Sequence, residues 1–159
     1  MDLKIGFGFD VHQLQEGYDL WIGGVKVPSE KGSVGHSDAD VLLHAICDAI
    51  LGAAGLRDIG FHFPNTSDDF KDADSRNLLT AVMTLITDKG YNVGNIDATL
   101  VSEVPKISPY ISDIKASISS LCNLADDEVG VKATTSETVG FVGRREGIEA
   151  YAVVLLEKQ

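Results

Sequence analysis

Asp10 and His12 stand two residues apart in the segment FGFDVHQL, which otherwise has the pattern of a strand. Side chains at i and i+2 of a strand point to the same face, roughly 6 to 7 Å apart. An acid and an imidazole placed in this way could bind one metal ion. Such pairs also arise by chance in an Asp-rich chain, so a metal site requires a third ligand.

His44 is the candidate for that third ligand. Apolar residues recur at helical spacing between 38 and 54, and His44 falls on the opposite, polar face with Asp40 and Asp48. Two His and one Asp with a fourth position open is the ligand count of a catalytic zinc site. The alternative is that His44 is a packed or solvent-facing helical residue.

His36 and Ser37 stand at the N-terminal end of the same expected helix. The free backbone N–H groups and the positive dipole end favour a phosphate oxygen there. Ser37, with Asp40 three residues on, also forms an imperfect capping box. We therefore expect Ser37 to cap the helix, which leaves a ligand contact open.

The segment VKATTSETVGF near the C-terminus combines a cation, hydroxyls and a carboxylate. Lys132 and Thr134 share one strand face, and a turn follows with Thr135 and Glu137. Such a group suits a phosphate and its magnesium ion. Without further context, Lys132 and Glu137 could equally be ordinary surface charges.

The order of expected elements predicts an α/β fold of the α+β type, in which helices pack on one face of a mixed sheet. The chain shows no repeat or linker, so we expect one domain over residues 1–159. The long connection 55–74 contains aromatic residues, which indicates a functional loop. The expected strands are 3–9, a hairpin over 20–27 around Gly23 and Gly24, 95–102, 129–134 and 148–157. The expected helices are 38–54, 75–89 and one that begins with Ser108 as its cap and Pro109 at the first helical position.

Composition excludes several classes of function. The net charge of -11 argues against nucleic acid as a partner, because nucleic-acid binders need clustered Lys and Arg. A phosphorylated small molecule would require metal ions or helix N-termini for local positive potential. No apolar run approaches a membrane span and no signal stretch is visible, so we expect a cytoplasmic protein. Cys47 and Cys122 are expected to be reduced packing residues.

A set of motifs covers almost the whole chain and closely resembles one family. In order, they are GFDVH, IGGVKVP, HSDADVLLHAICDAILGAAGLRDIG, FPNTSDDFKDADSRNLL, VPKISPYI and VKATTSETVGFVGRREGI. They resemble the 2-C-methyl-D-erythritol 2,4-cyclodiphosphate synthase family of the non-mevalonate isoprenoid pathway. The resemblance implies a phosphorus-oxygen lyase that converts 4-diphosphocytidyl-2-C-methyl-D-erythritol 2-phosphate to the cyclic diphosphate and CMP. It also implies a homotrimer with active sites at subunit interfaces.

Residue roles follow from the resemblance position by position. It implies Asp10, His12 and His44 as ligands of one Zn²⁺ per subunit and Glu137 as a ligand of Mg²⁺ or Mn²⁺ on the phosphates. Catalytic roles go to His36, Lys132 and Thr135. The substrate-binding positions implied in this way are Ser37, Asp58, Gly60, Asn65, Ser102, Lys106, Ile107, Ala133, Thr134 and Thr135, with segment 102–109 forming a cytosine pocket supplied by the neighbouring subunit.

The resemblance also implies a central cavity in the trimer. Phe9, Arg144 and Glu146 would line it, and it could accept an isoprenoid diphosphate. Two departures bear on these sites. Family members often carry Asp where this chain has Asn65, which replaces a carboxylate with an amide. Arg145 stands where a Gly can stand and adds a charge beside the cavity.

Two other functions remain open at this stage. A zinc-dependent phosphohydrolase would use the open metal position to activate water and would give a linear product. A non-catalytic trimer would bind an isoprenoid diphosphate without turnover. In the cyclase, by contrast, the substrate's own 2-phosphate is the nucleophile, so no protein base is needed.

Overall fold

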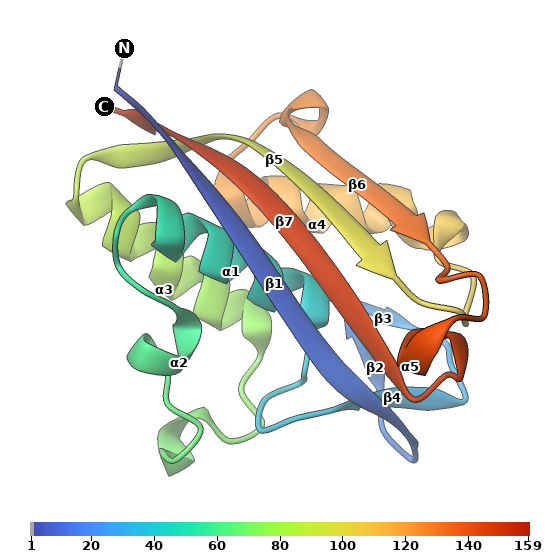
Figure 1. Cartoon of the computed structure of the whole chain (residues 1–159). Coiled ribbons are helices and arrows are strands. Elements are labelled where there is room, and N and C mark those ends of the chain that lie inside the picture. Colours follow the sequence, from blue (N-terminus) through green and yellow to red (C-terminus); the bar gives the residue numbers. More distant parts are fainter. Residues whose placement is uncertain (1) are drawn as a thin grey trace.

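A computed structural model describes residues 2–159 and shows a five-stranded mixed sheet (Figure 1). The strand order is β4-β1-β7-β5-β6, in which β5 and β6 run parallel and all other neighbours antiparallel. The strands are β1 (Leu3–Glu16), β4 (Lys31–Val34), β5 (Tyr91–Val101), β6 (Val129–Thr134) and β7 (Gly147–Lys158).

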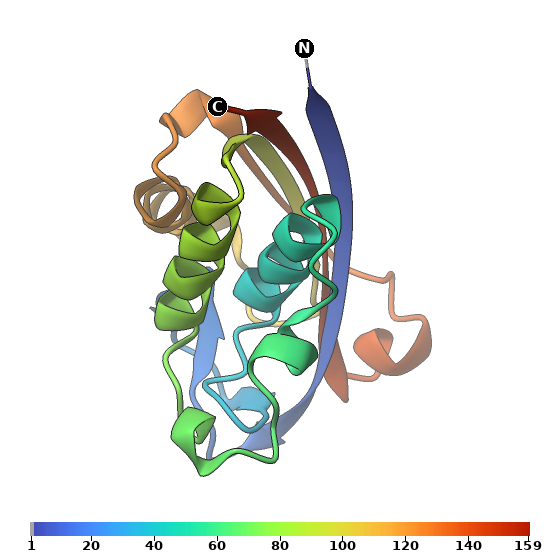
Figure 2. The ribbon, with the colours of Figure 1, turned by 90° about the vertical axis from the view of Figure 1, so that its left-hand side faces the viewer.

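Three long helices cover one face of this sheet (Figure 2). They are α1 (Val41–Ala53), α3 (Ser75–Asp88) and α4 (Ile111–Cys122). Their apolar sides and the inner sheet face form one hydrophobic core, in which Ile46, Ile50 and Leu100 are fully buried. This confirms the expected mixed α/β architecture with helices on one face. None of the helices in residues 2–159 is long and apolar enough to cross a membrane.

Short elements complete the chain. The hairpin of β2 (Leu20–Ile22) and β3 (Val25–Val27) turns at Gly23 and Gly24, whose φ angles of +61° and +81° suit a primed turn. The remaining short helices are α2 (Ile59–His62), α5 (Gly140–Gly143) and the 3₁₀ turns Asp68–Phe70, Ser108–Tyr110 and Asp126–Glu128.

Helix α1 packs directly against the backbone of β1. Gly6 and Gly8 face the helix, and a methyl group at either position would overlap the carbonyl oxygen of Ala49 or Ala45. Because side chains alternate along a strand, Asp10 and His12 share this inner face with the two glycines. The glycines therefore let α1 approach closely enough for its own side chains to reach Asp10 and His12.

Two capping predictions are wrong. Asp40, not Ser37, is the N-cap of α1: its Oδ1 accepts the Leu43 N–H at 3.0 Å. The same carboxylate accepts the N–H groups of Gly23 and Gly24 at 2.9 and 2.7 Å, so Asp40 also anchors the β2–β3 hairpin. Ser108 makes no side-chain cap either, because a 3₁₀ turn precedes α4.

The other elements agree with expectation apart from their ends. Residues 129–134 form β6 as predicted, and α3 ends one residue before Lys89. Strand β1 extends seven residues beyond the predicted 3–9, and β4 was missed. The connection 55–74 contains α2 and a 3₁₀ turn, so it is more structured than predicted.

Replacing Gly8 by Ala tests the close contact between α1 and β1. The methyl group would force the helix off the strand, so Gly8→Ala should lower the free energy of unfolding by about 1–3 kcal/mol, as overpacking does. Urea denaturation measures the change.

The matched control is Gly52→Ala, in the last turn of α1. A methyl group there meets nothing within 4 Å, so the same substitution should stabilise the protein by about 0.5–1 kcal/mol. Equal stability of Gly8→Ala and the parent protein would show that the helix and strand do not depend on this contact.

Candidate metal centre and pockets

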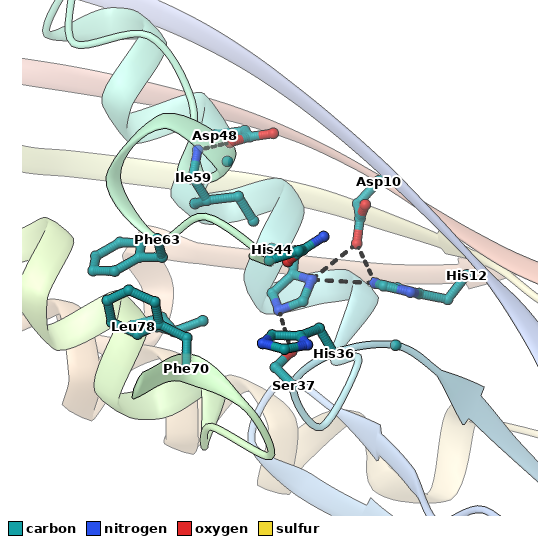
Figure 3. Close-up of a pocket in the computed structure, with 13 residues that line it drawn as sticks. Asp10, His12, His36, Ser37, His44, Asp48, Ile59, Phe63, Phe70 and Leu78 are labelled. Carbon is teal, nitrogen blue, oxygen red and sulfur yellow. Dashed lines mark hydrogen bonds and ion pairs between the residues drawn. The ribbon is translucent and has the colours of Figure 1, made fainter. Parts of the chain in front are cut away.

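Asp10, His12 and His44 converge on one point between β1 and α1 (Figure 3). Oδ2 of Asp10 lies 2.8 Å from Nε2 of His12 and 3.1 Å from Nδ1 of His44, and the two nitrogens are 3.2 Å apart. Three ligands on a tetrahedral ion with bonds of about 2.0–2.1 Å lie about 3.3 Å from one another. The three atoms therefore fit a single divalent metal with a fourth position open.

The outer nitrogens of both rings are also held. Nδ1 of His12 lies 3.1 Å from the Val34 carbonyl oxygen, and Nε2 of His44 lies 2.9 Å from Oγ of Ser75. Metal-binding histidines generally donate their second N–H to such an acceptor. With the outer nitrogens protonated, each neutral ring can offer the lone pair of its other nitrogen to an ion. This arrangement of donors is the one expected of a metal site.

The charges of the site favour the ligand form of Asp10. Partial burial opposes ionisation, but the close contacts with the His12 and His44 rings outweigh it and hold the pKa of Asp10 at about 2. Burial lowers the pKa of His12, but the hydrogen bond and charge of Asp10 outweigh it, so that pKa is raised. Asp10 is thus an anion throughout the physiological range and attracts a cation in the space beside it.

The metal ligands open into a pocket of about 360 Å³. Figure 3 shows the polar groups on one side and Phe63, Phe70 and Leu78 on the other. Among the described residues, none that line this pocket is Lys or Arg. The lining residues are Asp10, His12, Gly35, His36, Ser37, His44, Asp48, Ile59, Gly60, Phe63, Asn65, Phe70 and Leu78.

The polar face predicted for α1 is present but is much less exposed than expected. His44 is only 6% exposed and Asp40 is fully buried, because the β2–β3 hairpin and α3 cover this face. Asp48 accepts the Ile59 N–H at 2.8 Å, and burial raises its pKa. The loop after α1 is thereby fixed against the helix.

His36 and Ser37 reach the pocket from the loop before α1. Nε2 of His36 lies 3.1 Å from the Ser67 carbonyl oxygen, and Oγ of Ser37 lies 3.3 Å from Nε2 of His44. Gly60 and Asn65 line the pocket from the connection 55–74. Asp58 does not line it, because its carboxylate caps α2 by accepting the Phe61 N–H.

A second pocket of about 420 Å³ contains the other predicted substrate-binding residues except Asp58. It shares no lining residue with the metal pocket. Its walls come from the segment after β5 and from the end of β6. They include Ser102, Lys106, Ile107, Ala133, Thr134 and Thr135.

Lys132 and Glu137 line neither of these pockets. Lys132 is exposed and forms an ion pair with Asp97 on β5. Glu137 is exposed, with a left-handed φ of +54°. Its turn is held by Glu103, whose Oε1 accepts the N–H groups of Ser136 and Thr138. Sequence reasoning missed Glu103, since a lone acid between β5 and Pro105 carries no signal.

The residues expected in a trimer cavity lie outside the metal pocket. Arg144 pairs with Glu146 at 3.0 Å, and Phe9 packs on Tyr151 with ring centroids 5.2 Å apart. Arg144 and Arg145 line a separate pocket with Lys31. Phe9 is 43% exposed and points to the face of β1 opposite Gly8 and Asp10, which is the sheet face that α1, α3 and α4 do not cover.

Comparison with known proteins agrees with this fold. Residues 3–157 match the YgbB family. A 2-C-methyl-D-erythritol 2,4-cyclodiphosphate synthase of Phocaeicola vulgatus is 56% identical over 158 residues, which is 99% of each chain. A solved synthase of the same name, in a CDP-bound form, superposes with a TM-score of 0.90 at 36% identity and covers 97% of this chain and 100% of its own. A Plasmodium falciparum protein solved as a CDP complex gives a TM-score of 0.87 at 36% identity and covers 99% of this chain and 97% of its own.

Fold and site together define an α/β protein with a candidate metal centre of two His and one Asp between a sheet and its central helix. The chain belongs to the YgbB family.

Removing His44 tests the metal centre. His44→Ala deletes one of three ligands, so the affinity for a divalent ion should fall by more than about 100-fold, beyond the loss caused by outer-shell changes. Metal content after dialysis and titration with Zn²⁺ measure it. His62→Ala is the control, because the His62 ring lies outside the candidate metal site and, among residues 2–159, forms a hydrogen bond only to the Leu56 carbonyl oxygen. Undiminished metal binding by His44→Ala would remove His44 from the ligand set.

Proposed function

We propose that this protein converts 4-diphosphocytidyl-2-C-methyl-D-erythritol 2-phosphate to 2-C-methyl-D-erythritol 2,4-cyclodiphosphate and CMP in non-mevalonate isoprenoid biosynthesis. The observation that carries the proposal is the convergence of Asp10, His12 and His44 in the wall of a pocket, in a chain 56% identical to a named synthase. We propose that residues 1–159 act as one catalytic domain in the cytoplasm.

In this reaction an oxygen of the substrate's 2-phosphate forms a bond to the β-phosphorus. The bond from that phosphorus to the oxygen bridging it to the α-phosphate breaks, and CMP leaves with that oxygen. The attacking phosphate is already an anion, so no side chain needs to take a proton. Catalysis then depends on in-line placement and charge neutralisation.

The residues of the metal pocket suit the erythritol end of the substrate. Asp10, His12 and His44 would hold Zn²⁺, which supplies Lewis-acid stabilisation of a phosphoryl oxygen when bound. His36 and Ser37 would contact the phosphate and hydroxyl groups beside it. Gly60 and Asp58 would contact the ribose, and the side-chain amide of Asn65 would offer a hydrogen-bond donor to the substrate. The apolar side of the pocket excludes water that would compete as nucleophile.

The second pocket suits the cytidine diphosphate end. Segment 102–109 with Lys106 and Ile107, together with Ala133, would hold cytosine. Lys132, Thr134 and Thr135 would hold the diphosphate, and Glu137 would bind Mg²⁺ or Mn²⁺ on it. Two structures related to this chain were solved with CDP, which supports a nucleotide ligand of this class.

Because the two pockets share no residue, we propose that each active site combines the metal pocket of one subunit with the nucleotide pocket of the next in a homotrimer. The open sheet face supports such an assembly. Ile5 and Phe7 are 75% and 62% exposed there, beside Phe9, Val11 and Val153. An apolar patch of this kind marks a protein interface. Phe9, Arg144 and Glu146 would then line a central cavity that could accept an isoprenoid diphosphate.

Phosphorus NMR with the cytidine-linked substrate and Mg²⁺ tests the reaction directly. The cyclic diphosphate and CMP should appear, vanish after zinc is stripped and return when zinc is restored. A linear product would show that water is the nucleophile and that the protein is a phosphohydrolase. Binding without turnover by the metal-loaded protein would favour a non-catalytic isoprenoid diphosphate carrier.

Mixed trimers test the shared site. His44→Ala disables the metal pocket, and Ala133→Trp fills the nucleotide pocket. Differently tagged copies are co-expressed, and trimers carrying both tags are isolated. In a closed ring of heterologous contacts, one interface in three joins two intact halves, so these trimers should have about one third of the parent activity.

Each variant alone should be inactive as a homotrimer. Inactive mixed trimers would place each complete site within a single chain and contradict the shared-site proposal.

A further inference from the structure

On the side away from Asp10 and His12, the His44 ring is part of a chain of hydrogen bonds that does not include those two metal ligands. In Figure 3 one ring nitrogen of His44 points toward Asp10 and His12, and the other points toward the loop before α1. That outer nitrogen, Nε2, lies 2.9 Å from Oγ of Ser75, the fully buried first residue of α3. The Ser75 hydroxyl in turn donates to Oδ1 of Asp38.

The directions of these bonds follow from the available protons. A carboxylate has only acceptor oxygens, so the proton between Ser75 and Asp38 must belong to the hydroxyl. Once that proton is used, Oγ of Ser75 can only accept from His44. Nε2 of His44 must therefore carry hydrogen. In the neutral imidazole, which is the form that binds a metal, the lone pair is then on Nδ1, the atom that faces Asp10 and the metal position.

Asp38 is itself fixed by the backbone. Its Oδ2 accepts the Ser75 N–H at 2.9 Å, and its Oδ1 accepts the Asp40 N–H at 3.1 Å. These contacts join the start of α3 to the start of α1 and do not depend on a metal. The orientation of the Ser75 hydroxyl is thus set before an ion arrives.

The second histidine ligand has a different support. Nδ1 of His12 faces the Val34 carbonyl oxygen, a backbone group that no substitution removes. Ser37 also lies near Nε2 of His44, but at 3.3 Å, and its oxygen already accepts the Ala39 N–H. Of the two ring ligands, His44 alone depends on side chains for its tautomer, and Ser75 is its closer partner.

We propose that Asp38 and Ser75 are positioning residues of the metal centre: they fix His44 with Nδ1 bare and aimed at the ion. The inference rests on the metal ligands of the proposed function but requires no turnover. Outer-shell partners of this kind change metal affinity by about 10–100-fold when they are removed. Ser75→Ala and Asp38→Asn should each weaken Zn²⁺ binding by that factor.

The test is Zn²⁺ affinity of the full chain, measured without substrate against a chromophoric chelator. Because both residues act through one chain of hydrogen bonds, the double variant should bind Zn²⁺ about as weakly as Ser75→Ala alone. A merely structural role would give additive losses instead. Thermal denaturation of each variant checks that the fold is intact. If Ser75→Ala does not fold, the Zn²⁺ affinity of Asp38→Asn, which keeps the shape of the side chain, provides the test.

Ser119→Ala is the matched control, because Ser119 is also buried in a helix but its hydroxyl has no hydrogen-bond partner in the part of the chain that the structure describes. It should leave Zn²⁺ affinity unchanged. Additive losses, unchanged affinity in Ser75→Ala and Asp38→Asn, or a large loss in Ser37→Ala alone would overturn the proposal. A parent protein that binds Zn²⁺ as expected but gives no cyclic product would defeat the proposed function and leave this inference standing.

Discussion

The contact between α1 and the backbone of β1 is the constraint on which the site depends. Gly6 and Gly8 remove the side chains that would otherwise separate helix from strand. His44 then lies within 3.2 Å of both Asp10 and His12, although these residues are more than thirty positions apart in the chain. Metal sites tolerate deviations of only about 0.2 Å in bond length. A methyl group at Gly6 or Gly8 would push α1 away from β1 and so separate His44 from Asp10 and His12.

The same region explains how an acidic protein can hold an anionic substrate. Asp10, Asp38, Asp40 and Asp48 lie on or beside α1. Asp38, Asp40 and Asp48 accept hydrogen bonds from backbone N–H groups, and Asp10 contacts the two histidine rings. Asp38 and Asp40 thus serve the scaffold, while Asp10 and Asp48 also line the metal pocket. No described residue lining the metal pocket is Lys or Arg, so a divalent cation must supply its positive potential.

Sequence patterns predicted the elements whose periodicity is long and regular. Strand β6 and helix α3 are examples, and the pair Asp10 and His12 was identified because the alternation of a strand fixes their common face. Caps were predicted less well, since Ser37 and Asp40 are both good capping residues and only the position of Gly23 and Gly24 selects Asp40. Ser75 and Asp38 could not be predicted, because their contact joins two helices and has no local pattern.

Because the two pockets are separate, metal binding and turnover have different structural requirements. All three metal ligands belong to one chain and are positioned by contacts within it, so metal affinity is a property of the folded subunit. In the proposed trimer, the second pocket would hold the other end of the substrate and belong to the next subunit. Burial of Ile5 and Phe7 on assembly would then bring the two halves together. In such a protein the hydrophobic effect that drives association also completes the catalytic site, so turnover requires assembly while metal binding does not.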